Sequence, residues 1–313
     1  MNVAVPLGIA LVLSLLLTPL ARRLAVRLNL LDHPVERSSH TTPTPFGGGF
    51  AIFAAFWATT LALQWPPDRP LVGMALGSLI LLAVCTLDDK YKLPAAPRLL
   101  AQLGVGLVAW YFGVRVVQVN NPLEAWVGPE YIFMGWAQIP VTVLWIAFIT
   151  NAVNWLDGLD GLAGGVSSIA ALTLALVAAS GGESPTVVVA AAALAGASLG
   201  FLRYNFNPAS IFMGDVGAMF LGYMLACLSV TGAVKQPTAL VVFVPLLVLG
   251  LPIYDSAVTI LKRLWAGRPI YHPDRAHLHH RLLDSGLSTR ETVIFMYGIT
   301  GLLCMIALGV WLR

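Results

Sequence analysis

Charged side chains are scarce in this sequence. Asp, Glu, Lys and Arg make up only 11% of its 313 residues, whereas 58% of the residues are hydrophobic. A soluble domain has about 25% charged residues, so the composition excludes an ordinary soluble domain and predicts a polytopic membrane protein. The net charge of +3, without any patch that mixes basic and aromatic residues, gives no indication of a nucleic-acid partner.

Cysteine is also rare, and its three occurrences lie far apart in apolar stretches: Cys85, Cys227 and Cys304. This spacing suits neither a metal site nor a disulfide, so small core residues are expected. No Pro/Ser-rich linker or charged block divides the chain, which predicts one integral-membrane domain over residues 1–313. Arg22 and Arg23 follow the first apolar run instead of preceding it, which favours an uncleaved first span over a signal peptide.

Long apolar runs make up much of the sequence. A helix needs about 20 apolar residues to cross the hydrocarbon core, and the sequence therefore predicts an all-α membrane protein with ten transmembrane helices. The predicted spans are 3–21, 46–64, 71–87, 98–114, 137–152, 161–180, 185–202, 216–234, 238–261 and 291–312. Between the fourth and fifth spans, alternating valines around Asn120 predict a small hairpin or an interfacial segment.

Ten spans divide the connecting loops into two sets with unequal charge. One set contains 14 of the 18 Lys and Arg residues. The positive-inside rule then places this set in the cytoplasm, and places both termini and the hairpin in the periplasm. The same set contains most of the paired acids and the clustered histidines, so a site on the cytoplasmic face is expected.

Two acidic motifs fall in these cytoplasmic loops. LDDKYK pairs Asp88 with Asp89, which suits a divalent metal or a general base, although an ordinary helix end explains it equally well. In NAVNWLDGLDG, Asp157 and Asp160 would share one face if the segment were helical. One Asp would serve as an N-cap, but the acids and asparagines of this loop exceed that need, and acids at the edge of a membrane usually mark a site.

Three further segments belong to the same face. IFMGDVG isolates Asp215 at the start of an apolar span, where it suits an N-cap or, among glycines, a metal and phosphate site. HTTPTPFGGGF, which contains Thr44, would wrap a nucleotide or simply turn the chain. Asp255, inside the ninth predicted span, is either a site residue or a packing acid satisfied by a cation such as Lys262.

The segment RPIYHPDRAHLHHRLL is rich in His and Arg. Its closely spaced histidines do not have the i, i+4 spacing of a helical zinc pair, and imidazoles beside arginines suit an anionic ligand better. A basic segment attracted to anionic lipid would explain the arginines but not the histidines. Taken together, the motifs predict a site for a divalent metal and a phosphate, open to the cytoplasm.

In this order, the motifs DDK, NAVNWLDGLDGL, FMGD and PDRAHLHHRL closely resemble those of the polyprenyl-phosphate N-acetylhexosamine-1-phosphate transferases. This family includes the bacterial enzymes that start O-antigen, enterobacterial common antigen and teichoic acid synthesis, and phospho-MurNAc-pentapeptide translocase is a more distant relative. The resemblance runs from about residue 30 to 285, and HLHH is similar to the O-antigen and teichoic acid branch. Phe46 is a departure, because this branch usually has Arg there.

The resemblance implies the metal and acceptor side of the site. Asp215 would be the main ligand of Mg2+, with Mn2+ as an alternative metal. Asp88 and Asp89 would lie beside the metal and the phosphate of undecaprenyl phosphate, with Lys92 near the phosphates. The lipid phosphate would attack the β-phosphorus of a UDP-sugar directly and release UMP, and a phosphoryl-enzyme route through an Asp stays open.

The resemblance also implies the donor side of the site. Asp157 and Asp160 would take part in catalysis at the border of the nucleotide-sugar. The expected substrate-binding residues are Thr44, Asn154, Asn205, Phe212, Arg268, Arg275, His277, His279 and His280. The sugar of the UDP-N-acetylhexosamine would be GlcNAc, GalNAc, FucNAc or QuiNAc, and the bacterial inner membrane is the expected location, with a homodimer left open.

Two other protein classes compete with this interpretation. An ion-coupled transporter or flippase of a glycan pathway would place acids near the bilayer midplane, whereas nearly all acids here lie in the loops, with Asp255 as the exception. A non-catalytic scaffold would not need five acids on one face. The transferase is therefore the favoured function.

Overall fold

Twelve α-helices make up most of the chain in the computed structural model, which describes residues 2–32, 43–120, 131–181, 184–233, 240–267 and 277–312. The first six are α1 (Ala4–Arg27), α2 (Gly48–Leu63), α3 (Arg69–Tyr91), α4 (Ala95–Tyr111), α5 (Gln138–Leu156) and α6 (Leu162–Ser180). The others are α7 (Pro185–Asn205), α8 (Gly214–Ala233), α9 (Leu240–Val248), α10 (Gly250–Trp265), α11 (Leu278–Asp284) and α12 (Thr289–Trp311). A 3-10 turn at Gly135–Ala137 leads into α5.

Seven described helices are long and apolar enough to cross a membrane: α1, α3, α5 with its preceding turn, α6, α7, α8 and α12. The chain is therefore a multi-pass, all-α membrane protein, as the composition predicts. Of the other predicted spans, α2 is a shorter apolar helix of 16 residues and α4 has 17. A total of ten crossings stays a prediction.

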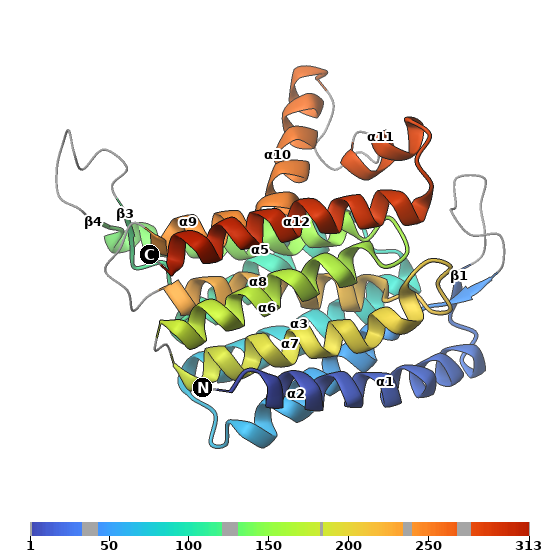
Figure 1. Cartoon of the computed structure of the whole chain (residues 1–313), viewed down its shortest axis with the longest axis horizontal. Coiled ribbons are helices and arrows are strands. Elements are labelled where there is room, and N and C mark those ends of the chain that lie inside the picture. Colours follow the sequence, from blue (N-terminus) through green and yellow to red (C-terminus); the bar gives the residue numbers. More distant parts are fainter. Residues whose placement is uncertain are drawn as a thin grey trace.

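The ninth predicted span, 238–261, is not one continuous helix. It is divided into α9, which packs against α12, α6 and α8, and α10, which stands out from the bundle (Figure 1). The break falls at Leu249, whose φ of −97° and ψ of 14° depart from helical values. Pro252 has no N–H to donate to the carbonyl of Val248, four residues earlier, and a proline in this position bends or ends a helix.

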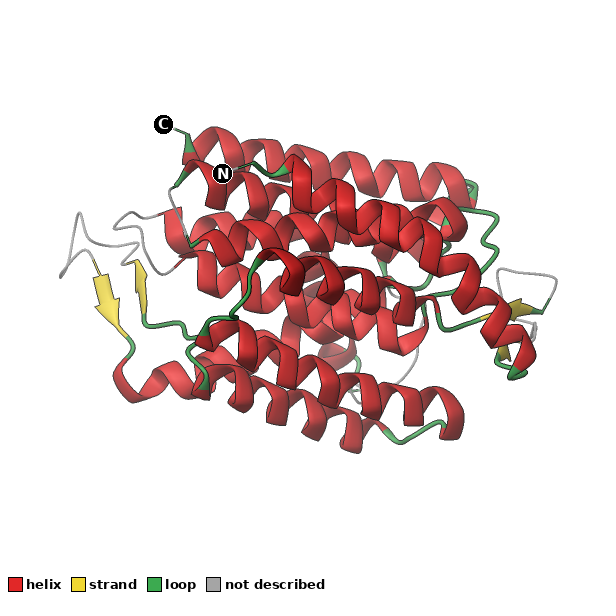
Figure 2. Cartoon of the chain, turned by 90° about the horizontal axis from the view of Figure 1, so that it is seen from below, coloured by secondary structure: helices red, strands yellow, loops and turns green. Residues whose placement is uncertain are grey.

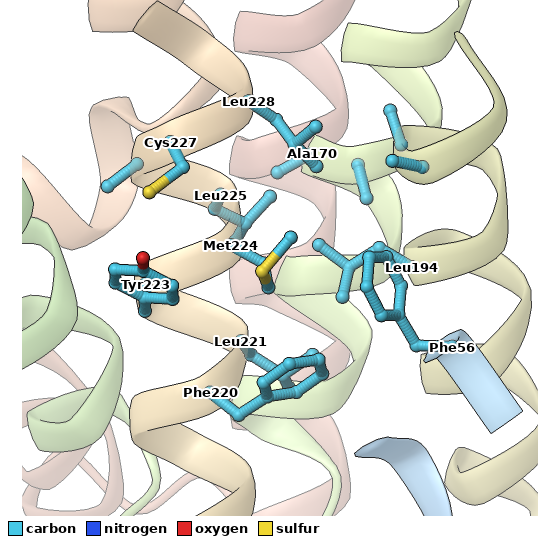
Figure 3. Packing of buried hydrophobic residues seen from close by; sticks show 14 of the residues in the cluster. Phe56, Ala170, Leu194, Phe220, Leu221, Tyr223, Met224, Leu225, Cys227 and Leu228 are labelled. Carbon is cyan, nitrogen blue, oxygen red and sulfur yellow. The ribbon is translucent and has the colours of Figure 1, made fainter. Parts of the chain in front are cut away.

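Helix α8 forms the centre of the bundle and packs against α2, α3, α5, α6, α7 and α9. Figure 3 shows its buried side chains among those of neighbouring helices, with Phe220 facing Phe56 of α2. These two rings meet edge-on, with their centroids 5.4 Å apart. The hydroxyl of Tyr223 donates to the carbonyl of Gly73 in α3 at 3.3 Å. These contacts fix α8 against α2 and α3.

Helices α1 and α7 approach each other closely because α7 has glycines on the contact face. A Cβ atom at Gly196 would lie 2.1 Å from the carbonyl oxygen of Leu7, and one at Gly200 would lie 2.5 Å from that of Leu11. Small residues allow this close approach of backbones between transmembrane helices. Helix α1 is therefore fixed against α7 by close contact between the two backbones.

Two short antiparallel strand pairs lie at opposite ends of the bundle (Figures 1 and 2). At one end, β1 (Leu31–Asp32) pairs with β2 (Thr44–Pro45). At the other end, where both termini lie, β3 (Gln118–Asn120) pairs with β4 (Tyr131–Phe133). The second pair confirms the hairpin that the alternating valines predict.

Candidate active site

The predicted acids gather at the end of the bundle that is opposite the termini. Asp88 and Asp89 lie in the last turn of α3. Asn154 lies in the last turn of α5, and Asp157 is the first residue after that helix. Asp215 lies in the first turn of α8. Because α3 and α5 run toward this end and α8 runs away from it, motifs that are far apart in the sequence become neighbours.

Asp215 has partners on two other helices. Its Oδ1 accepts a hydrogen bond from the side-chain amide of Asn154 at 2.8 Å. Its backbone N–H donates to Oδ1 of Asp89 at 3.4 Å. Gly214, at a φ of +70°, makes room for this contact, because a Cβ atom there would lie 3.0 Å from Oδ2 of Asp89. The structure thus brings the DDK, NAVN and FMGD motifs into one cluster.

Arg98, in the first turn of α4, joins two of these acids. Its Nη1 lies 3.1 Å from Oδ2 of Asp88 and 3.6 Å from Oδ2 of Asp215. The other oxygen of Asp88 accepts the backbone N–H of Leu93 at 2.7 Å. In the sequence, Arg98 is only one of the cations that mark this end of the bundle, and none of the motifs includes it.

Asp157 and Asp160 do not share a helical face, because α5 ends at Leu156 and α6 begins at Leu162. Asp160 is tied to the loop after α7, where its Oδ2 accepts from Asn207 Nδ2 at 3.0 Å and from the N–H of Ala209 at 2.9 Å. Asp157 is the first residue after α5 and is close enough to the acid cluster to be affected by its charges. Burial, followed by the negative charges of Asp215, Asp160 and Asp89, raises the pKa of Asp157 well above its ordinary value.

Asn205 is bonded to the loop between α5 and α6. It is buried at the end of α7, where its Oδ1 accepts the N–H of Gly161 at 3.0 Å and its Nδ2 donates to the carbonyl of Ile211 at 3.0 Å. Gly161 has a φ of +83°, a conformation that favours glycine, and its carbonyl accepts a hydrogen bond from Tyr297. Asn205 therefore joins the 157–161 loop to the segment that leads to α8.

The segment after β2 and the segment before α8 are joined through their backbones. Phe212 N–H donates to the carbonyl of Pro45 at 2.9 Å, and Gly48 N–H donates to the carbonyl of Phe212 at 2.9 Å. Phe46 and Phe212 form a parallel bridge. Thr44 is buried in β2 beside this junction. Two motifs that lie about 165 residues apart in the printed sequence therefore border one site.

The described histidines lie above the acid loop. His279 is buried, and a Cβ atom at Gly158 would lie 2.5 Å from its Nε2, so the ring lies directly over the NWLDGLDG loop. Burial, with His280 as the next cause, lowers the pKa of His279 to about 3. The ring of His279 is nearly parallel to that of His277, with centroids 5.7 Å apart, and 4.3 Å from that of His280.

Three other predicted residues have simpler outcomes. Lys92 ends α3 with a φ of +52° and an exposed side chain, and its N–H donates to the carbonyl of Asp88. Arg268 and Arg275 lie outside the described residues. Their expected contacts with phosphate stay predictions.

The donor atoms of the cluster suit a hard cation. Within the described parts of the chain, no three His, Cys, Asp or Glu side chains come together as a group that could hold a metal. Mg2+, however, is commonly bound by one or two carboxylates together with water and substrate phosphates. Asp88 and Asp215 already share one cationic group, Arg98. Carboxylate oxygens are ligands that Mg2+ prefers, so the donor atoms of Asp88 and Asp215 are of a suitable kind for this ion.

Comparisons with known proteins give the same family as the motifs. Residues 71–233 match the model of glycosyl transferase family 4. A Bacillus subtilis protein named as a probable undecaprenyl-phosphate N-acetylglucosaminyl 1-phosphate transferase is 38% identical over 95% of this chain and 81% of its own. A decaprenyl-phosphate N-acetylglucosaminephosphotransferase of Mycobacterium tuberculosis is 33% identical over 88% of this chain and 74% of its own.

A more distant similarity extends to the peptidoglycan branch. A phospho-N-acetylmuramoyl-pentapeptide-transferase of Caldicellulosiruptor bescii is 29% identical over 85% of this chain and 82% of its own length. These relatives are transferases by name, and they favour an enzyme over the transporter or flippase alternative.

Proposed function

The chain belongs to glycosyl transferase family 4, and on this premise we propose that it transfers an N-acetylhexosamine 1-phosphate from a UDP-sugar to undecaprenyl phosphate and releases UMP. This reaction would be the first membrane step in the synthesis of a cell-surface glycan. The names of the relatives support a polyprenyl phosphate acceptor and, for the sugar, GlcNAc.

The observation that carries the proposal is the acid cluster at one end of a membrane bundle. Its acids come from the ends of α3 and α8 and from the loop after α5: Asp88, Asp89, Asp215 and Asp157. The end of α5 adds Asn154, and the start of α4 adds the cation of Arg98. A lipid phosphate and a water-soluble nucleotide-sugar can meet only where the bilayer meets water. A site at helix ends satisfies this requirement.

The chemistry is a displacement at phosphorus. A phosphomonoester has a second pKa of about 6, so the lipid phosphate is mostly a dianion near neutral pH and needs little help from a base. Its oxygen forms a bond to the β-phosphorus of the UDP-sugar, while the bond from that phosphorus to the bridging oxygen breaks and UMP takes the electron pair. Asp88 would accept any proton that remains on the attacking phosphate.

We propose that Asp215 is the main ligand for Mg2+, with Mn2+ as a substitute, and that Asp88 and Asp89 lie beside the ion. When bound, the ion would neutralise phosphate charge. Asn154 orients the carboxylate of Asp215 by its hydrogen bond. Arg98 holds the side chain of Asp88 and offsets the repulsion between neighbouring carboxylates.

The donor would lie between the acid loop and the histidines. Asp157 carries less negative charge than an ordinary Asp because its pKa is raised, so it repels a pyrophosphate less. Phe212 and Thr44 would border the uridine, and His277, His279 and His280 would close over the phosphates or the sugar. Asn205 acts through the loop that it supports.

The proposed orientation follows from the excess of Lys and Arg in the loops at the site end. The active site would face the cytoplasm, and both termini and the β3–β4 pair would face the periplasm of a bacterial inner membrane. Labelling an added cysteine in each set of loops with an impermeant reagent, in intact and in opened cells, tests this orientation. Labelling of the site-end loops in intact cells would contradict it.

Purified protein, supplied with Mg2+, undecaprenyl phosphate and a panel of UDP-N-acetylhexosamines, tests the reaction. We expect release of UMP and formation of a lipid-linked sugar phosphate with at least one member of the panel. A folded protein that releases UMP from none of them would refute the proposal.

A further inference from the structure

A buried carboxylate on α10 is bonded to the start of α11. Oδ2 of Asp255 lies 2.9 Å from Nδ1 of His277, and Oδ1 accepts the backbone N–H of Leu278 at 2.6 Å. Asp255 is only 4% exposed and His277 only 6%. The sequence alone allows two roles for Asp255: a site residue, or a packing acid paired with a cation such as Lys262. The structure pairs it with a histidine of the predicted site.

The two hydrogen bonds determine where the proton of His277 lies. A backbone N–H can only donate, so Oδ1 of Asp255 is occupied as an acceptor. Oδ2 of an ionised carboxylate can also only accept, so Nδ1 of His277 must carry a hydrogen. A neutral His277 is then the Nδ1–H tautomer, and its Nε2 has a free lone pair. The hydroxyl of Thr259, 3.4 Å from Nδ1, is a weaker contact.

The ring of His277 lies among residues that border the acid loop. Its centroid is 6.0 Å from that of Trp155, the residue after Asn154. On another side it is nearly parallel to the ring of His279, which lies over Gly158. A shift of the His277 ring would therefore be transmitted to the NWLDGLDG segment at Trp155 and, through His279, at Gly158.

We infer that Asp255 is a positioning residue: through the bond to His277 Nδ1 it fixes the tautomer and the ring plane of His277, and through Leu278 it attaches α11 to α10. The effect of this arrangement on catalysis rests on the proposed function, in which His277 contacts the phosphates or the sugar. The tautomer of His277 does not rest on it. The break at Leu249 matters for this contact. It lets α10 leave the bundle, and Asp255 on α10 thereby reaches His277.

Asp255→Asn is the sharpest variant because it keeps the shape of the side chain. The single oxygen of the new amide must accept the N–H of Leu278, which leaves its NH2 group facing His277. That group can only donate, so Nδ1 of His277 must become an acceptor and its proton must move to Nε2. We therefore expect the opposite tautomer of His277 without a change in fold.

The tautomer can be measured directly by nitrogen-15 NMR of histidine-labelled full-length protein in detergent or nanodiscs. The chain has six histidines, and the signal that His277→Gln removes identifies the ring. We expect Nδ1–H in the wild type and Nε2–H in Asp255→Asn. Tyr254→Phe, which removes an exposed hydroxyl next to Asp255, and Thr259→Val should both keep the wild-type tautomer.

Turnover provides the second readout. UMP release by Asp255→Asn should fall by about 10- to 100-fold, by analogy with the loss of a carboxylate that orients a metal-binding histidine. The double variant Asp255→Asn with His277→Gln should lose no more activity than His277→Gln alone, because one acts through the other. Tyr254→Phe should stay near the wild-type rate.

The outcomes separate this inference from the proposed function. A neutral Nε2–H tautomer of His277 in the wild type would overturn the inference even if Asp255→Asn did not fold. An unchanged tautomer and rate in a folded Asp255→Asn would do the same. The expected tautomers together with a wild-type protein that releases no UMP would leave Asp255 as the positioning residue and refute the transferase.

Discussion

Asn154 near the end of α5 donates a hydrogen bond of 2.8 Å to the carboxylate of Asp215 in the first turn of α8. The bond holds Oδ1 of Asp215 and directs the carboxylate toward the space that Arg98 and Asp88 border. Because Asn154 on α5 holds the side chain of Asp215 on α8 directly, the position of this acid does not depend on the loops that connect the helices. Asp215 is therefore the residue whose charge can be tested most cleanly.

Asp215→Asn keeps an acceptor for Asn154 but removes the charge that a divalent cation requires. We expect Mg2+-dependent UMP release to fall on the order of 100-fold or more, with expression and thermal unfolding close to the wild type. Asp68→Asn is the matched control, since Asp68 caps α3 by accepting the N–H of Leu71 and Asn caps equally well. Near-wild-type turnover in Asp215→Asn would show that the metal lies elsewhere.

Arg98→Ala should lower turnover by about 10- to 100-fold, because Asp88 loses a hydrogen bond from a charged group worth about 1.5–3 kcal/mol. Arg98→Lys should retain part of the activity. Arg115→Ala removes an arginine that binds the carbonyl of Trp110 at the opposite end of the bundle, and it should not alter turnover. Equal loss in the two alanine variants would indicate a general effect of removing arginine.

Gly196→Ala should destabilise the bundle by about 1–3 kcal/mol, because the added Cβ meets the backbone of α1, which cannot rotate away. Gly298→Ala is the control within α12. No atom lies within 4 Å of a Cβ at Gly298, so alanine there should leave stability unchanged or raise it by about 0.5–1 kcal/mol. Thermal unfolding in one detergent compares the two, and similar melting temperatures would contradict the close contact of α1 and α7.

His279 should make stability depend on acidic pH. Its folded-state pKa of about 3 lies below the ordinary value of 6.5, so the unfolded chain takes up a proton first as the pH falls. The stabilising contribution is therefore complete above pH 6.5 and is lost progressively toward pH 3. Melting temperature measured across this range should fall less steeply for His279→Gln, and an unchanged slope would mean that His279 does not titrate in this way.

The gathering of acids at one end could be predicted, because helix direction and loop charge determine which loops share a face. Asp88, Asp157 and Asp215 follow from that reasoning alone. The bonds of Arg98 and Asp255 could not be predicted, since they depend on how far α4 and α10 lie from their partners. Hydropathy does not reveal the break at Leu249, because the residues immediately before and after it, VPLLV and GLPI, are apolar.

The contact between His279 and Gly158 has a consequence for evolution. A side chain larger than hydrogen at position 158 would occupy the place of the imidazole Nε2. Two positions about 120 residues apart are thus sterically coupled. Among related chains, those with a larger residue at 158 should also differ at 279, so the two columns of an alignment should covary.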